Sequence, residues 1–285
     1  MDELQSDYSV YRQVVSQLLN DQEQLPSLPM LTLEIRRALA TPEVSMARLH
    51  GLIGKDPALS ALLVKYAASP LQRTRVMPRT LQDVLRVLGM QQVDRVVMMH
   101  SIKSLFTLQS PSHKQLFLAA WQRLTLKASL CGFLARTLGA VPPEQAVLAS
   151  LLSDVGALAL LSAFKDSSLA PSPAHYQALC QRYGHSLGAM LLNKWAVDEE
   201  YVHIVRALGD WSAPGAARLE LIDLVNLGHY HVLLEAGETD GLPPLAELAA
   251  YAKLYPPRDE LAGDGALALV AHNWEEIHAL AAVLR

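Results

Sequence analysis

The sequence is poor in several kinds of residue, and each shortage excludes a class of protein. Its 285 residues include only two cysteines, Cys131 and Cys180, which lie too far apart for a metal-binding spacing. We therefore expect two reduced, buried thiols rather than a disulfide framework. Charged residues make up 18% of the chain, while 51% are hydrophobic, so the composition excludes a disordered protein.

A basic excess and a long apolar run are also missing. The net charge is −4, which argues against general nucleic-acid binding because such binding depends on positive charge. No uninterrupted apolar run reaches the roughly 18 residues that a membrane span requires. The acidic residues 1–7 lack the basic-then-apolar order of a secretory signal. We expect a cytoplasmic protein that binds neither nucleic acid nor a membrane.

Strand-like alternation is almost absent, whereas helical periodicity recurs along the chain. Ser45 is placed to cap a helix, and Asp56 followed by Pro57 marks the start of another. Thr80 can cap a further helix, which Gly89 is expected to end. These signals predict an all-α fold.

The predicted helices fall into two groups. A polar break at residues 109–112 separates them, and a long helix from about residue 112 to 138 follows, ending at Gly139. We therefore predict a two-lobed helical protein, with an N-terminal helical lobe at 1–110 and a second helical lobe at 111–285.

One segment resembles a catalytic signature. Residues 151–156 read Leu-Leu-Ser-Asp-Val-Gly, which is similar to the pattern apolar-apolar-His-Asp-apolar-Gly of HD phosphohydrolases, with Ser153 in place of the histidine. Further motifs occur in a fixed order: Leu-Pro-x-Leu-Pro at 25–29, Lys-Asp-Pro-x-Leu at 55–59, Ala-Ala-Ser at 67–69, Leu-Gly at 88–89 and Gly-x-x-Leu-Leu-x-x-Trp at 188–195. Together they resemble the HDOD family, an HD-related output domain of bacterial signalling proteins. The resemblance implies an N-terminal helical bundle followed by an HD-domain or phosphodiesterase-like lobe.

The same resemblance implies that the catalytic centre is lost. An HD site gathers histidines and aspartates around one or two metal ions that activate water. Here the corresponding positions hold Arg123, Ser153 and Asp154, and the later histidines have no clear counterpart. We interpret these three residues as vestigial and expect no catalytic residues, no metal and no cofactor. Because a buried charge needs a partner, we also hypothesise that Arg123 pairs with Asp154.

The remaining histidines give no metal-binding pattern. His229 and His231 are two residues apart, which on a helix directs their rings to different faces. His185 has no close-spaced partner. We expect each histidine to be exposed or to make a structural hydrogen bond.

An arginine-rich segment is the other candidate site. It contains Arg73, Arg75, Arg79, Arg86 and Arg95. Guanidinium groups suit phosphates and carboxylates, so this segment could bind an acidic partner or a small anionic effector. A solvated helix and loop face is the alternative that we favour, since no glycine-rich cradle accompanies the arginines.

These observations predict a non-catalytic bacterial signal-transduction module that acts by binding unidentified signalling proteins, through the cleft between its lobes. Two alternatives stay open. One is a degenerate metal-dependent phosphohydrolase or phosphodiesterase that uses other ligands around Asp154. The other is a sensor of a small anionic ligand at the arginine-rich segment.

Overall fold

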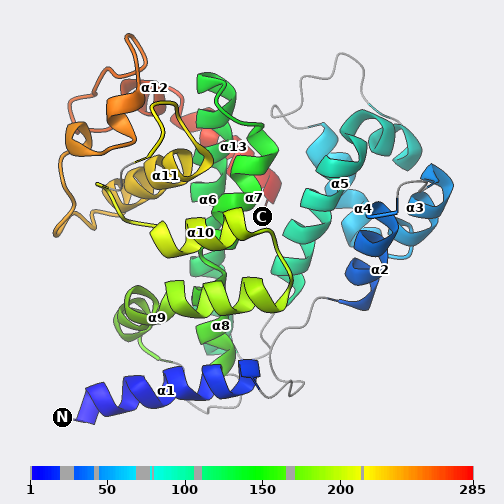
Figure 1. Cartoon of the computed structure of the whole chain (residues 1–285), viewed down its shortest axis with the longest axis horizontal. Coiled ribbons are helices and arrows are strands. Elements are labelled where there is room, and N and C mark those ends of the chain that lie inside the picture. Colours follow the sequence, from blue (N-terminus) through cyan, green and yellow to red (C-terminus); the bar gives the residue numbers. More distant parts are fainter. Residues whose placement is uncertain are drawn as a thin grey trace.

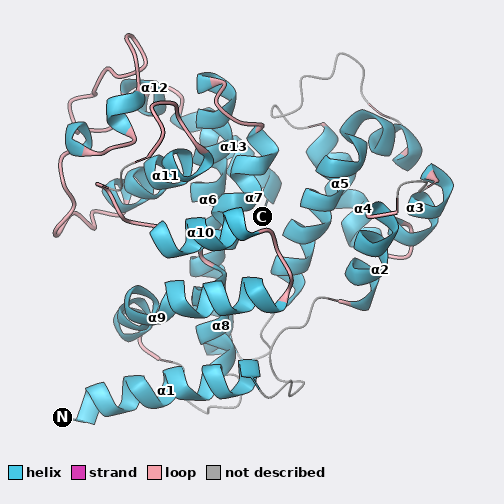
Figure 2. Cartoon of the chain, in the orientation of Figure 1, coloured by secondary structure: helices cyan, strands magenta, loops and turns pink. Residues whose placement is uncertain are grey.

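The structure is a computed structural model that describes residues 2–19, 29–41, 45–68, 78, 80–105, 111–164, 171–212 and 215–284. These residues form helices and loops with no β-strand, apart from one isolated bridge between Leu261 and Leu267 (Figure 2). The all-α prediction is confirmed. The helices are α1 Asp2–Leu19, α2 Met30–Leu39, α3 Met46–Ile53, α4 Pro57–Ala67, α5 Leu81–Leu105, α6 Pro111–Leu138, α7 Pro143–Ser153, α8 Val155–Ala163, α9 Pro173–Lys194, α10 Glu199–Ala207, α11 Leu221–Glu235, α12 Ala268–Ala271 and α13 Trp274–Leu284, with short 3-10 turns at Leu245–Glu247 and Tyr251–Lys253.

Two helices begin where their capping residues predict. The Ser45 hydroxyl accepts a hydrogen bond from the Arg48 N–H at 3.1 Å and starts α3. The Asp56 carboxylate accepts from the N–H groups of Ala58 and Leu59 at 2.9 and 3.0 Å and starts α4. Both caps satisfy N–H groups that have no partner within the helix, which is why the sequence alone locates them.

Helix α5 begins as predicted and continues beyond its expected end. Thr80 and Asp83 cap each other's backbone N–H groups at 3.1 and 3.2 Å. Gly89 adopts a φ of 71°, which interrupts the helix, but the chain resumes a helical course to Leu105. Val93 and Val96 beyond the kink are fully packed, so burial of the second half favours its continuation. The expected end at Gly89 is therefore a kink.

The described helices gather into two lobes (Figure 1). Helices α2 to α5 form the smaller N-terminal lobe, and α6 to α13 form the larger one. Helix α6 lies at the centre of the larger lobe and contacts α7, α8, α11 and α13. The predicted long helix, with Gly139 at its end, is confirmed as α6.

Helix α1 packs against α8 and α9 of the larger lobe, although the sequence analysis counts its residues with the first lobe (Figure 1). Val14 is fully buried there, and the Tyr11 ring stacks on Tyr183 with centroids 4.6 Å apart. Asp7 and His175 approach to 3.3 Å at the same contact. An isolated amphipathic helix gains stability by covering its apolar stripe, and α8 and α9 supply the surface that does so.

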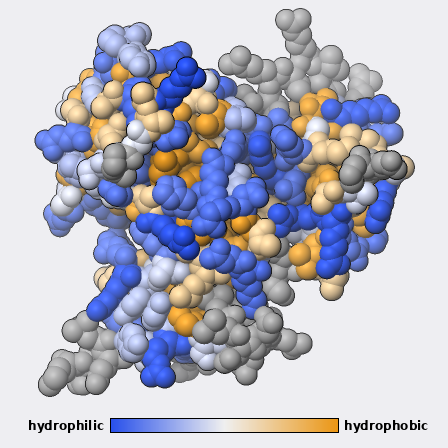
Figure 3. All heavy atoms as spheres, viewed as in Figure 1, coloured by the Kyte–Doolittle hydropathy of each residue, from blue (hydrophilic) through white to orange (hydrophobic). Residues whose placement is uncertain are grey.

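The junction between the lobes is polar. Arg95 on α5 pairs with Glu144 on α7 at 2.8 Å, and the Gln92 amide donates to the same carboxylate at 3.2 Å. On α4, the Lys65 ammonium donates to the carbonyl of Ala282 in α13 at 2.8 Å. Figure 3 shows hydrophilic side chains along this junction on the face that it presents. The junction therefore resembles contacts between domains more than the interior of one core.

The most apolar part of the larger lobe is its interior. Residues Pro143–Leu161 have the length and hydropathy of a membrane span, although polar residues interrupt the apolar run. The stretch is not one helix, because Asp154 separates α7 from α8. Of its apolar window, 78% is buried inside the protein, so packing against other helices accounts for its composition.

Gly156 allows α8 and α9 to approach closely. A Cβ atom placed on Gly156 would overlap the carbonyl oxygen of Gly184 and would lie 2.6 Å from the backbone nitrogen of Gly188. Both neighbours are backbone atoms of another helix, so they cannot move aside as a flexible side chain would. The glycine of the 151–156 motif therefore has a packing role.

Substitution of Gly156 by alanine should destabilise the protein by at least about 3 kcal/mol, because the extra methyl group forces α8 and α9 apart. Urea denaturation followed by circular dichroism measures this change. Gly51→Ala is the matched control, since a Cβ there meets no atom within 4 Å, and it should stabilise α3 by about 0.5–1 kcal/mol. Equal stability of the two variants would contradict the packing argument.

Candidate functional site

The candidate site lies where α6 faces the break between α7 and α8. Arg123 and Lys127 are four residues apart on α6, so their side chains leave the same face of the helix. Asp154 follows the last residue of α7, with φ −109° and ψ 11°, and its backbone is not helical. The Asp154 side chain thus projects from a break between two helices toward α6.

Lys127 and Asp154 form an ion pair in the interior of the larger lobe. Lys127 is 1% exposed, and its Nζ also donates a hydrogen bond to the Ser153 hydroxyl at 2.8 Å. Ser153 in turn donates its proton to the Ser150 carbonyl at 2.7 Å, which leaves its lone pairs free to accept from Lys127. A buried ammonium group is costly unless it is paired and hydrogen-bonded, and this arrangement supplies both.

The hypothesis that Arg123 pairs with Asp154 is wrong. The Arg123 guanidinium instead forms a two-pronged pair with Glu238, beyond the end of α11, in which the second contact measures 2.9 Å. Lys127 lies one helical turn further into the core, and its single ammonium reaches Asp154 there. Sequence reasoning missed Lys127 because it compared only positions that the HD pattern names.

Two histidines lie close enough to alter the charge state of Asp154. His229 comes from α11 and His185 from α9, two helices that the motif reading does not connect with Asp154. The Trp211 ring stacks on His229 with centroids 5.7 Å apart. The fold therefore brings near Asp154 two histidines that the motifs do not connect with it.

The other histidine of the pair 229 and 231 faces away, as its spacing predicts. Nδ1 of His231 hydrogen-bonds the Leu227 carbonyl at 2.7 Å, and the Leu267 N–H donates to its Nε2 at 3.0 Å. With Nε2 accepting, Nδ1 carries the proton. His231 is thus a buried, hydrogen-bonded histidine.

The electrostatics of the cluster favour an ionised Asp154 and neutral histidines. Burial by itself raises the pKa of Asp154, but the interactions with Lys127, His229 and Arg123 outweigh burial and lower it. Burial, together with the charge of Lys127, lowers the pKa of His229 to about 3. The pKa of His185 is also lowered, first by burial. At neutral pH the lysine therefore supplies the positive charge that Asp154 requires.

The residues of this site do not fit a catalytic metal ion. Within the described ranges, no group of three or more His, Cys, Asp or Glu side chains is placed to hold one. The Asp154 carboxylate is already bound by Lys127, and Arg123 places a second positive charge nearby. A divalent ion would have to displace the ammonium and overcome this repulsion.

Comparison with known proteins assigns the chain to a family. A sequence model of the HDOD domain matches residues 25–210. The chain belongs to the HDOD family. It is also 23% identical over 199 residues to an uncharacterised protein of Treponema pallidum (strain Nichols), and the match covers 65% of this chain and 37% of that protein. The chain therefore spans little more than a third of that relative's length.

Several solved structures share the HDOD fold. A provisionally named metal-dependent phosphohydrolase from Shewanella amazonensis SB2B is 18% identical, with a TM-score of 0.77 and full coverage of both chains. An HDOD domain protein of unknown function from Geobacter sulfurreducens is 18% identical, with a TM-score of 0.64 and coverage of 99% and 98%. A provisionally named signal transduction protein from Marinobacter aquaeolei VT8 is 20% identical, with a TM-score of 0.55 over 100% of this chain and 67% of that one. At these identities the likeness shows the fold, including the predicted HD-like second lobe.

Most of the arginine-rich segment cannot be placed in this fold. Arg73, Arg75 and Arg79 lie outside the described residues. Arg86 lies on the exposed face of α5, whereas Arg95 on the same helix is half-buried and paired with Glu144. The structure therefore does not bring Arg86 and Arg95 into a shared site.

The two cysteines behave as ordinary thiols. Cys131 is buried and donates weakly to the Leu224 carbonyl at 3.4 Å, while Cys180 is half-buried. Burial raises the pKa of Cys131 to about 11 and that of Cys180 to about 12, so neither is a thiolate at neutral pH. The expected reduced thiols are confirmed as free cysteines.

Replacing Lys127 with methionine should cost about 2–3 kcal/mol of unfolding free energy, because it leaves Asp154 without its counter-ion. The cost is below that of a fully buried pair, since the Asp154 side chain is 31% exposed. The double variant Lys127→Met/Asp154→Asn should recover at least about 1 kcal/mol of the loss. Chemical denaturation of the two single variants and the double variant measures the coupling.

Lys114→Met is the control for this cycle, because Lys114 is an exposed lysine on the same helix. It should change the unfolding free energy by no more than about 0.5 kcal/mol. If Lys127→Met were as mild as the control, the buried pair would have no structural role.

Proposed function

We propose that this HDOD protein is a regulatory module that does not catalyse a reaction and that acts by binding other proteins. The proposed lack of catalysis rests on the buried Lys127 ammonium, which Asp154 and Ser153 hold at the position of the HD signature. Membership of the HDOD family supports a regulatory role, because this family resembles output domains of bacterial signalling proteins. We also propose a bacterial and cytoplasmic setting.

Lys127 neutralises the Asp154 carboxylate, as a metal ion would in an active HD site. An ammonium group neutralises the carboxylate and needs no further anionic ligands, whereas a catalytic metal must also bind and polarise water. Lys127 is itself fully packed, so it offers no open coordination position to a substrate. The serine at position 153 suits this arrangement, because its hydroxyl accepts a hydrogen bond from the lysine.

The absence of metal-dependent hydrolysis can be tested directly. Protein purified from cells grown with added manganese, iron and nickel should contain well under one metal ion per chain, because Lys127 competes for Asp154. Elemental analysis measures the metal, and assays with bis-p-nitrophenyl phosphate and cyclic dinucleotides measure hydrolysis. We expect no turnover above that of Asp154→Asn. Stoichiometric metal that is lost in Asp154→Asn would refute the proposal and favour the degenerate phosphohydrolase.

We place the contact with a partner protein on the exposed surface of α5. Arg86 is exposed there, and beside it Val87 and Met90 are large apolar side chains that are also exposed. Arginine and methionine are enriched at protein interfaces, and this combination suits a partner whose surface is acidic with an apolar centre. The cleft between the lobes remains a part of the proposed interaction surface, since α5 forms one of its walls.

If a partner protein binds this surface, the contact at Arg86 should depend on its charge. A partner identified by affinity capture from the native cell should bind the purified chain stoichiometrically, and Arg86→Glu should weaken that binding about tenfold or more. Arg218→Glu, at an exposed arginine of the larger lobe, should have little effect. Isothermal titration calorimetry with the two purified proteins measures both variants. Equal effects of both reversals would mean that α5 is not the contact surface.

A further inference from the structure

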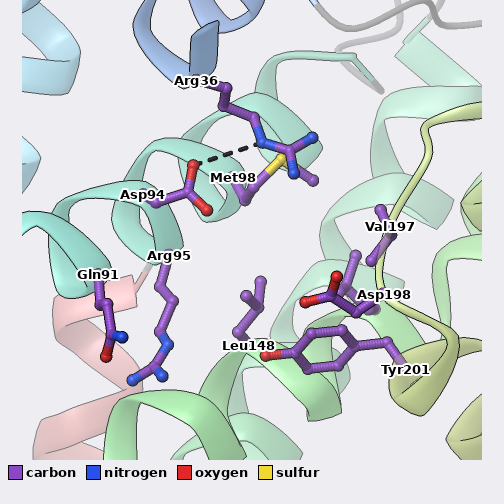
Figure 4. Close-up of a pocket in the computed structure, with 10 residues that line it drawn as sticks. Arg36, Gln91, Asp94, Arg95, Met98, Leu148, Val197, Asp198 and Tyr201 are labelled. Carbon is purple, nitrogen blue, oxygen red and sulfur yellow. Dashed lines mark ion pairs between the residues drawn. The ribbon is translucent and has the colours of Figure 1, made fainter. Parts of the chain in front are cut away.

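A cavity lies between the two lobes, away from the Lys127–Asp154 pair. Its volume is about 210 Å³, and its wall combines charged and apolar side chains (Figure 4). Arg36 and Asp94 line it from the smaller lobe, while Leu148, Asp198 and Tyr201 line it from the larger lobe. At roughly 30 Å³ for each water molecule in the liquid, the cavity holds the volume of about seven waters. It is therefore suited to a small molecule.

The lining holds two positive and two negative side chains, but their ion pairs leave one carboxylate without a partner. Arg36 is paired with Asp94 at 3.4 Å, and Arg95 is paired with Glu144 at 2.8 Å. The Asp198 carboxylate has neither an ion pair nor a hydrogen bond within the described part of the chain, and although Asp198 precedes α10 it makes no side-chain cap. In Figure 4 this carboxylate points into the space opposite Asp94. Asp198 is an exposed residue, so the cavity presents one unpaired negative charge at a position that solvent also reaches.

Tyr201 contributes a second group that lacks a partner. Its side chain is buried, with 8% of the residue exposed, and its hydroxyl points into the cavity (Figure 4). No hydrogen bond to this hydroxyl is formed by any described residue. Burial, opposed by the charge of Arg95 and reinforced by the charges of Glu200, Asp198 and Asp94, raises the pKa of Tyr201 to about 12. The hydroxyl therefore keeps its proton at neutral pH and can both donate and accept.

We propose that this cavity binds a small organic cation, an alkylammonium or alkylguanidinium, between the lobes. The N–H groups of such a cation would donate to the Asp198 carboxylate, to the Tyr201 oxygen and, on the opposite wall, to the Asp94 carboxylate that it would share with Arg36. Its alkyl part would lie against the apolar side chains of Leu148 and Val197, which line the same space. Unpaired polar groups in a cavity gain most from a ligand that satisfies them, which is the basis of this assignment.

The chemistry of the lining excludes two other ligand classes. A divalent metal ion needs several carboxylate or imidazole ligands, and no cluster of three such side chains occurs among the described residues. An anion would face the unpaired carboxylate of Asp198, whereas Arg36 and Arg95 each already pair with a carboxylate. The ligand proposed here therefore has the opposite charge to the effector that the arginine-rich segment suggests.

A ligand in this cavity would contact both lobes at once. Its binding energy would favour whichever lobe arrangement keeps Asp94 and Asp198 at the distance it bridges. This proposal does not depend on the absence of catalysis, because neither Lys127 nor Asp154 lines the cavity, and its test uses the purified chain without a protein partner.

Isothermal titration calorimetry with the full chain tests the proposal. The probes are methylguanidinium and agmatine as cations, methylurea as the neutral counterpart of the first, and inorganic phosphate as an anion. We expect saturable binding of the cations with a dissociation constant in the millimolar range or below, weakened by added salt, and no binding of methylurea or phosphate. Equal binding of methylurea, binding of phosphate alone, or no binding of either cation would overturn the proposal.

Two conservative variants locate the site. Asp198→Asn should weaken cation binding about fivefold or more, because it removes the uncompensated charge, and Tyr201→Phe should weaken it about threefold. Asp240→Asn removes a charge from an exposed loop and should leave the affinity unchanged. Circular dichroism and the melting temperature without ligand show that each variant is folded. Unchanged affinity in both cavity variants would place any binding elsewhere.

Discussion

The ion pair between Lys127 and Asp154 is the constraint on which the larger lobe depends. A lysine that is 1% exposed must find an anion and hydrogen-bond acceptors inside the protein, because burying it unpaired would cost several kcal/mol. Asp154 supplies the anion and Ser153 an acceptor, and both residues lie where α7 ends. The pair therefore fixes the central helix α6 against the break between α7 and α8. Gly156, two residues later, lets α8 meet α9 closely enough to close the lobe.

The same pair determines the charge state of its neighbours. Burial lowers the pKa of His229 to about 3 with the positive charge of Lys127 as the second cause, so this histidine stays neutral. The neutral His229 ring stacks on the Trp211 ring. The Asp154 carboxylate of the motif is thus neutralised by a lysine of the neighbouring helix α6.

Local features of the fold could be predicted from the sequence, and long-range ones could not. The caps at Ser45 and Asp56 depend on residues within three positions, so their chemistry is legible in the chain itself. The kink at Gly89 was predicted as an end, because the sequence shows the glycine but not the tertiary burial that continues α5. The pairing of Arg123 with Glu238 joins residues 115 positions apart, and no motif connects them. Motif comparison found Asp154 and overlooked Lys127, because position 127 is not among the positions that the motifs name.

Helix α7 links the two polar centres of the molecule. Near its start Glu144 binds Arg95 of the smaller lobe, and directly after its end Asp154 binds Lys127. Eleven residues at about 1.5 Å each separate the two ends by roughly 16 Å of rigid helix. A shift of the lobes that strained the Arg95–Glu144 contact would act on α7, which the Lys127–Asp154 pair holds against α6 at its other end. The part of the junction with unpaired polar groups is the cavity, where Asp198 and Tyr201 line the wall. One end of α7 is thus held within the larger lobe, and its other end is held across the junction between the lobes.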